Sequence, residues 1–169
     1  MDSEMIFKSY TYGTLTLPEV AEKLLDFYNR HKEYDTDFTL MIGTDSQNFA
    51  YTKIVNVIAI ICQGHGGIFF HHISHMDLLL DVRRKLHEET TESLEIAESL
   101  VELLESDKKF EEMYLNTPIQ LHIDAGNSNK GKTKTLIREL TGWVTACGYT
   151  ACVKPDSYAA SSIADRISK

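Results

Sequence analysis

The chain has 169 residues, of which 43% are hydrophobic, and this size and composition are typical of a single domain with a substantial core. Its net charge of -8 argues against a protein that coats nucleic acid through a positive surface, but it is compatible with an acidic cleft that holds cations. The longest apolar run, residues 57–62, is too short to cross a membrane, and three cysteines without a CxxC spacing indicate reduced thiols in a cytoplasmic protein.

The first 36 residues are predicted to be a helical N-terminal extension of one domain that covers residues 1–169. A capping box begins the helix, because Thr16 is followed three residues later by Glu19, with Pro18 in the first turn. Apolar residues then recur at helical spacing, which predicts a helix over residues 17–31.

Three strands are predicted next. The first is the β-rich run DFTLMIGTDSQ, residues 37–47, and the second and third cover residues 50–64 and 66–76. Glycines at positions 64, 66 and 67 lie where the second strand gives way to the third, so these two strands should form a hairpin.

The rest of the chain alternates between helix and strand. Helices are predicted over residues 78–106 and 132–148, the second closed by Gly148, and a last helix over 157–168. Strands are predicted over residues 118–126 and 149–155. This order indicates an α/β fold with a five-stranded mixed sheet, three antiparallel strands followed by parallel ones, and with helices on both faces.

Two aspartates end apolar strands, and the topology should bring them together. Right-handed crossovers place the fourth strand beside the first, so Asp45 and Asp124 would share the sheet edge where open α/β sheets bind ligands. A charged residue rarely ends a buried strand unless it is paired or bound to a cation. The alternative is that each aspartate caps the turn that follows it.

Two further carboxylates are candidates for the same site. Glu89 falls on the inward-facing stripe of its helix where an apolar residue was expected; it could instead lie at the stripe edge, and Glu92 is the second choice. Asp165 lies in the last predicted helix, where an ion pair with Lys169 is the alternative. Asp156 competes with it, although its position before a helix is typical of an N-cap.

The motifs GTDSQ, HIDAGNSNKGKT and KPDSYAASSIADR resemble those of the YkuK-type family of predicted nucleases with a ribonuclease H-like fold. The resemblance covers nearly the whole chain. It implies a metal-dependent nuclease that hydrolyses RNA, DNA or a hybrid with two divalent cations, Mg or Mn. It also implies that Asp45 bridges both cations, that Glu89 and Asp124 flank one, and that Asp165 holds the other. A member of the fold that binds nucleic acid or protein without catalysis is an alternative.

Several residues could contact the phosphates of a substrate. Ser46 and Gln47 follow the first aspartate directly. Residues 126–133, GNSNKGKT, match a phosphate-loop pattern and could instead bind a nucleotide. Few residues follow this loop, so we interpret it as a grip on the substrate backbone through Lys130, Lys132 and Thr133.

Histidines are concentrated on the predicted hairpin. His65, His71, His72 and His75 match no common zinc spacing, so a hairpin surface explains them more simply than a zinc site. His122 shares a strand face with the second aspartate. It could orient a ligand or assist proton transfer, or it could be a core histidine.

Overall fold

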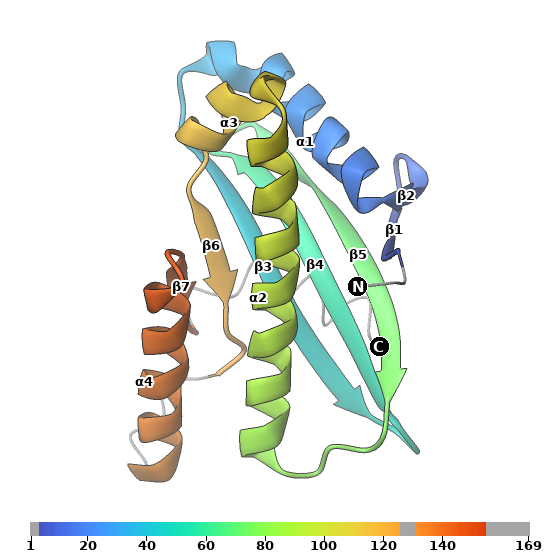
Figure 1. The fold of residues 1–169 in the computed structure, drawn as a ribbon, viewed down its shortest axis with the longest axis vertical. Helices are drawn as coiled ribbons and strands as arrows, with labels where there is room; N and C mark the ends of the chain where they lie inside the picture. The colour runs from blue at the N-terminus through green and yellow to red at the C-terminus, as the bar shows by residue number, and fades with distance from the viewer. Residues whose placement is uncertain (1–3, 126–130, 155–169) are drawn as a thin grey trace.

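The computed structural model describes residues 4–125 and 131–154, which form a seven-stranded mixed sheet with helices packed against it (Figure 1). The strand order is β2-β1-β5-β4-β3-β6-β7. The expected number of five strands is therefore wrong. The two additional strands, β1 (Ile6–Ser9) and β2 (Gly13–Thr16), form a hairpin in the N-terminal extension, which was expected to be helical only. Lys8 of β1 pairs with His71 of β5, so this hairpin extends the sheet edge.

The centre of the sheet is an antiparallel meander of three long strands, as the sequence predicted. These are β3 (Phe38–Asn48), β4 (Thr52–Cys62) and β5 (Gly66–Met76). The turn between β4 and β5 contains Gly64 and Gly66, both in the left-handed region with φ of 80° and 86°. Glycine adopts this conformation without steric cost, which explains why the hairpin turns there.

The strand β6 (Ile119–His122) lies parallel to β3, which confirms that the fourth predicted strand is the neighbour of the first. The last strand, β7 (Thr150–Cys152), is parallel to β6 on its other side. In the register, Gly43 is opposite His122. The carboxyl ends of β3 and β6 therefore lie at the same end of the sheet.

The three long helices of the described residues form where sequence periodicity placed them, whereas one short α-helix and two 3-10 helices were not predicted. They are α1 (Leu17–His31), α2 (Val82–Ser106) and α4 (Gly131–Ala146), with a short α3 (Glu111–Asn116) and the 3-10 helices η1 (Lys32–Tyr34) and η2 (Lys108–Phe110). The capping box of α1 is formed as predicted, since the Thr16 side chain accepts a hydrogen bond from the backbone of Glu19 and the Glu19 side chain accepts one from Thr16. No helix in the described part of the chain is long and apolar enough to span a membrane.

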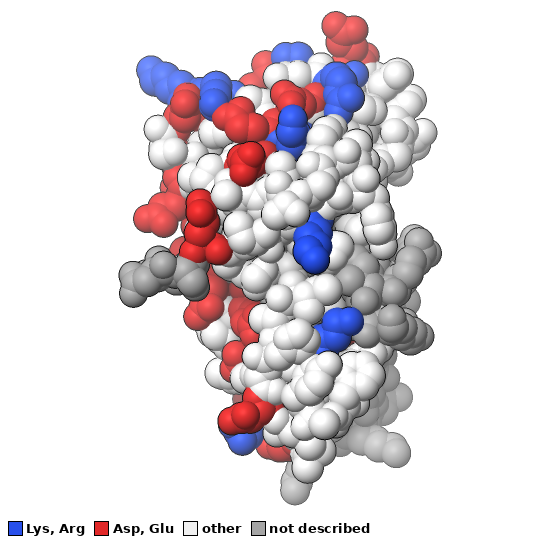
Figure 2. All heavy atoms as spheres, turned by 90° about the vertical axis from the view of Figure 1, so that its right-hand side faces the viewer, with Lys and Arg blue, Asp and Glu red and all other residues white. Residues whose placement is uncertain are grey.

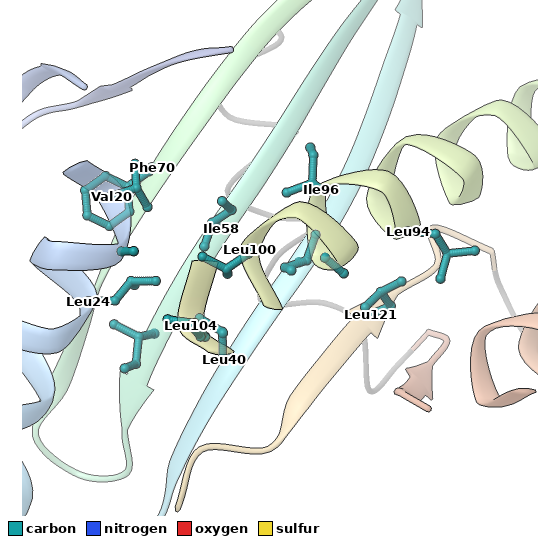
Figure 3. Close-up of a cluster of buried hydrophobic side chains, with 14 of the residues drawn as sticks. Val20, Leu24, Leu40, Ile58, Phe70, Leu94, Ile96, Leu100, Leu104 and Leu121 are labelled. Atoms are coloured by element: carbon teal, nitrogen blue, oxygen red, sulfur yellow. The ribbon is translucent and has the colours of Figure 1, made fainter. Parts of the chain in front are cut away.

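The main core lies between the helices and one face of the sheet. Each described α-helix contributes buried side chains to it, and Figure 3 shows Leu100 and Leu104 of α2 together with Leu40 and Ile58 of the sheet. The opposite face carries a smaller cluster from β3 and β4: Met41, Val55, Val57 and Ala59. The described helices thus cover one face, and the predicted helix over 157–168 lies outside the described residues.

The core contacts of α2 should be among the main determinants of stability. Leu100 is fully buried, so Leu100→Ala should lower the free energy of unfolding by about 2–5 kcal/mol through lost burial and a cavity. Leu115→Ala is the matched control, because this helical leucine is 74% exposed. Urea unfolding measures both variants, and equal losses would contradict the assignment of the core.

Candidate active site

Asp45 and Asp124 lie in direct contact at the carboxyl ends of β3 and β6. Asp45 is in β3 and only 6% exposed, and Asp124 follows β6 by two residues. Burial, the hydrogen bond to Asp124 and repulsion from its charge raise the pKa of Asp45 to about 7. Burial also opposes ionisation of Asp124, but hydrogen bonds from Lys154 and Asp45 outweigh it and hold the pKa of Asp124 below its usual value. The pair therefore favours one shared proton, with Asp45 as the donor.

Glu89 lies near this pair and is itself buried, with 5% of its surface exposed. The Ser46 hydroxyl donates a hydrogen bond to Glu89 Oε2 over 2.5 Å, which joins α2 to β3. Burial first, and then the charges of Asp45 and Asp124, raise the pKa of Glu89 to about 8, although the hydrogen bond from Ser46 opposes this shift. Three carboxyl groups from distant parts of the chain are therefore coupled electrostatically.

Glu92, the second choice for the helical carboxylate, belongs to a different set of contacts. Its Oε1 accepts a hydrogen bond of 3.2 Å from Asn56 Nδ2. Burial first, and then the charges of Glu88 and Glu95, raise the pKa of Glu92 to about 7. Glu89 is thus the glutamate whose charge interacts with the aspartate pair.

Buried hydrogen bonds hold α2 in this orientation over β3. The hydroxyls of Thr44 and Ser93 lie 2.7 Å apart, and Asn56 Nδ2 donates to Thr44 Oγ1 over 2.9 Å. Residues 44 and 46 project to the same side of the strand, while residues 89 and 93 are one turn apart on the helix. The two strand–helix contacts therefore fix the rotation of α2 that turns Glu89 inward.

Two lysines that sequence reasoning missed balance the negative charge. Lys154 Nζ lies 2.7 Å from Asp124 Oδ1, and the charge of Lys85 lowers the pKa of Asp45, Glu89 and Asp124 alike. The sequence positions of both lysines indicate that they lie near the carboxylates. Lys85 precedes Glu89 by four residues on one helix face. Lys154 follows β7 by two residues, as Asp124 follows β6, and the ends of those strands are paired.

The carboxylates supply the hard oxygen donors that Mg or Mn prefers, but the described residues hold no complete ligand set. Among residues 4–125 and 131–154, no group of three or more His, Cys, Asp and Glu side chains is arranged to hold a metal ion. Strand alternation explains part of this, because Ser46 faces α2 while Asp45 lies on the side of its partner Val55. Asp165 and its alternative Asp156 lie outside the described residues.

The structure describes only some of the residues that were predicted to contact substrate phosphates. Ser46 is buried against Glu89, and Gln47 is half-buried one residue further along β3. Lys130 lies outside the described residues, and Lys132 and Thr133 fall in the first turn of α4, where only the backbone is described. The strand–loop–helix order that a phosphate loop needs is present, from β6 to α4.

The hairpin histidines point in different directions. His71 is buried, and burial lowers its pKa, whereas the neighbouring His72 contacts the Ile6 carbonyl through Nδ1 over 2.8 Å. Zinc ligation by these residues has no support in the described part of the chain. His122 is also buried, and its Nε2 lies 3.2 Å from Gln120 Oε1. A part for His122 in proton transfer stays a prediction.

Comparison with known proteins identifies the family. A sequence model described as Ribonuclease H-like matches residues 19–169. The chain is also 32% identical over 177 aligned residues to the Uncharacterized protein YkuK of Bacillus subtilis (strain 168), and the alignment covers all of both chains. The chain belongs to the YkuK-type ribonuclease H-like family. No solved structure was found to match it. The mixed sheet with its parallel β3–β6 pair fits the fold of the ribonuclease H-like family.

The raised pKa of Asp45 predicts how stability depends on pH when no metal is present. An aspartate with a higher pKa in the folded chain stabilises the fold while protonated; this contribution is complete below about pH 4 and is lost as the pH rises through about 7. Asp45→Asn stays neutral at every pH. Relative to the wild type, it should therefore gain roughly 1–3 kcal/mol of unfolding free energy between pH 5 and pH 8.

Urea unfolding in EDTA at the two pH values measures this gain. Asp37→Asn is the matched control, since Asp37 is exposed at the opposite end of the same strand. Its stability difference from the wild type should not change with pH. If the difference in unfolding free energy between Asp45→Asn and the wild type were also independent of pH, Asp45 would not share a proton with Asp124 as we infer.

Proposed function

We propose that the protein is a metal-dependent nuclease that hydrolyses phosphodiester bonds in RNA, DNA or a hybrid. The contact between the Asp45 and Asp124 carboxyl groups is the observation that carries this proposal. Two such groups are costly to bury together unless a proton, a lysine or a cation compensates for their charge. Membership of the ribonuclease H-like family supports a nuclease, since the fold commonly binds nucleic acid.

Asp45, Glu89 and Asp124 would hold the cations, together with Asp165 as the sequence resemblance implies. When bound, two Mg or Mn ions would activate a water molecule and stabilise the leaving oxygen of the phosphodiester. The charges of the site favour their entry. Lys85 and Lys154 offset only part of the negative charge of three carboxylates, and the raised pKa values of Asp45 and Glu89 reflect their burial first and the remaining repulsion second.

Two side chains of the protein hold the carboxylates of the site in place before a cation binds. Ser46 orients Glu89 through its hydrogen bond, which holds the carboxylate of α2 against β3 one residue after Asp45. Lys154 is paired with Asp124 and is half exposed, so it can turn away when a cation takes its place or can contact a substrate phosphate. To hold a cation, Asp45 would have to release the proton that it shares with Asp124, so cation binding should be stronger at higher pH.

Removing either aspartate should abolish cleavage and metal binding together. Purified wild type should cut short RNA, DNA or hybrid substrates with Mn or Mg, whereas Asp45→Asn and Asp124→Asn should cut none. Isothermal titration with Mn should show binding to the wild type and to the Asp37→Asn control only. A wild type that cuts no nucleic acid with either metal would contradict the proposal and favour a non-catalytic binding protein.

The two glutamates of α2 should differ in their effect on activity. Glu89→Gln should lower cleavage by at least about 10-fold, because even partners outside the ligand set of a metal cost 10–100-fold. Glu92→Gln should leave cleavage near the wild-type rate, since Glu92 contacts Asn56 instead. Steady-state cleavage at saturating Mn measures both variants, and the reverse order would show that Glu92 is the ligand.

A further inference from the structure

The segment directly after Asp45, residues 46–76, carries no acidic residue. Residues 46–76 contain one lysine and four histidines but no Asp or Glu, although the protein has 25 acidic residues in total. This segment forms the end of β3 and the whole of β4 and β5. Figure 2, viewed from the side of β5 and β1, shows acidic side chains gathered along one margin and at the top, and mostly uncharged side chains with isolated basic groups over the central surface. Within these strands no carboxylate repels a polyanion, and the next acidic residue, Asp77, follows directly after β5.

Exposed aromatic rings lie at one end of this acid-free segment. The loop between β3 and β4 presents Phe49, which is 52% exposed, and Tyr51, which is 44% exposed. Their ring centroids are 5.9 Å apart, and the Tyr51 ring contacts that of His75 edge-on at 4.9 Å. A backbone hydrogen bond of 2.7 Å from Phe49 to Tyr51 holds the loop. Two adjacent exposed rings form a small apolar surface on which another ring can stack.

The rings continue the row of side chains that begins at the candidate active site. In the strand register, Gln47 is opposite Lys53, and Lys53 is opposite His75. Gln47 lies on the same side of β3 as Asp45, because side chains alternate along a strand. Phe49 follows four residues after Asp45, which is about 13 Å along an extended chain. A few nucleotides of an extended strand cover this distance.

We infer that Phe49 and Tyr51, with Lys53 and His75 beside them, bind the unpaired bases of single-stranded nucleic acid next to the site of cleavage. This inference rests on the proposed function, because it places the substrate on the acid-free segment beyond Asp45. Bases stack on exposed aromatic rings whatever their sequence, while a neighbouring cation contacts the backbone. A base pair inside a duplex offers no free face to the rings, so the surface selects single strands over blunt duplex.

Binding in EDTA tests this inference separately from catalysis. Fluorescence anisotropy would measure the affinity of the full chain for short single-stranded RNA and DNA of mixed sequence and for a blunt duplex. Phe49→Ala/Tyr51→Ala should weaken single-strand binding by about 10-fold or more and leave duplex binding unchanged. The conservative variants Phe49→Tyr and Tyr51→Phe should keep wild-type affinity. Tyr34→Ala is the matched control, because Tyr34 is 54% exposed near the other end of β4.

A second readout reports stacking itself. The fluorescence of 2-aminopurine in the single strand should be quenched by the wild type and by the Asp45→Asn variant, but not by the double alanine variant. Single-strand binding that is unaffected by the alanines, or an equal loss of duplex binding, would overturn the inference. If the wild type binds single strands through these rings but never cleaves, the rings are a binding site for single strands and the proposed nuclease function fails.

Discussion

The contact between Asp45 and Asp124 is the constraint on which the account of this protein depends. The parallel pairing of β3 with β6 creates it, because the register that sets Gly43 opposite His122 also brings Asp45 beside Asp124, two residues further along each segment. Burying two carboxyl groups side by side opposes folding, and the raised pKa of Asp45 expresses this cost. The ion pair from Lys154 and the charge of Lys85 relieve it only in part. A site that keeps such a contact is suited to bind cations.

The remainder of the fold serves to hold this edge rigid. The helix α2 is anchored by its buried leucines in the core, and near the site it is held by the Thr44–Ser93 and Ser46–Glu89 hydrogen bonds. These contacts set the rotation of the helix in which Glu89 faces β3 at Ser46. Precise placement of catalytic groups requires this kind of support from packed elements. The acid-free segment of residues 46–76 then adds no carboxylate of its own to the site.

Local patterns were enough to predict most of the fold and the residues that meet at the sheet edge. The capping box at Thr16 located α1, and Glu89 stood out because it interrupts an apolar stripe. The N-terminal hairpin was missed because each of its strands has only four residues, too few to show an alternating pattern. Lys85 and Lys154 were missed because lysines are common on surfaces, and only the register of β6 and β7 reveals that Lys154 reaches Asp124. Short elements and non-local charge pairs are set by tertiary contacts, which periodicity does not report.

The most direct test of the account is a crystal structure of the protein soaked in Mn, with an anomalous difference map to locate the ions. The account predicts density within about 2.0–2.3 Å of carboxylate oxygens of both Asp45 and Asp124, with Lys154 displaced from Asp124. Density elsewhere on the protein, or a Lys154–Asp124 ion pair that persists at high Mn concentration, would contradict it.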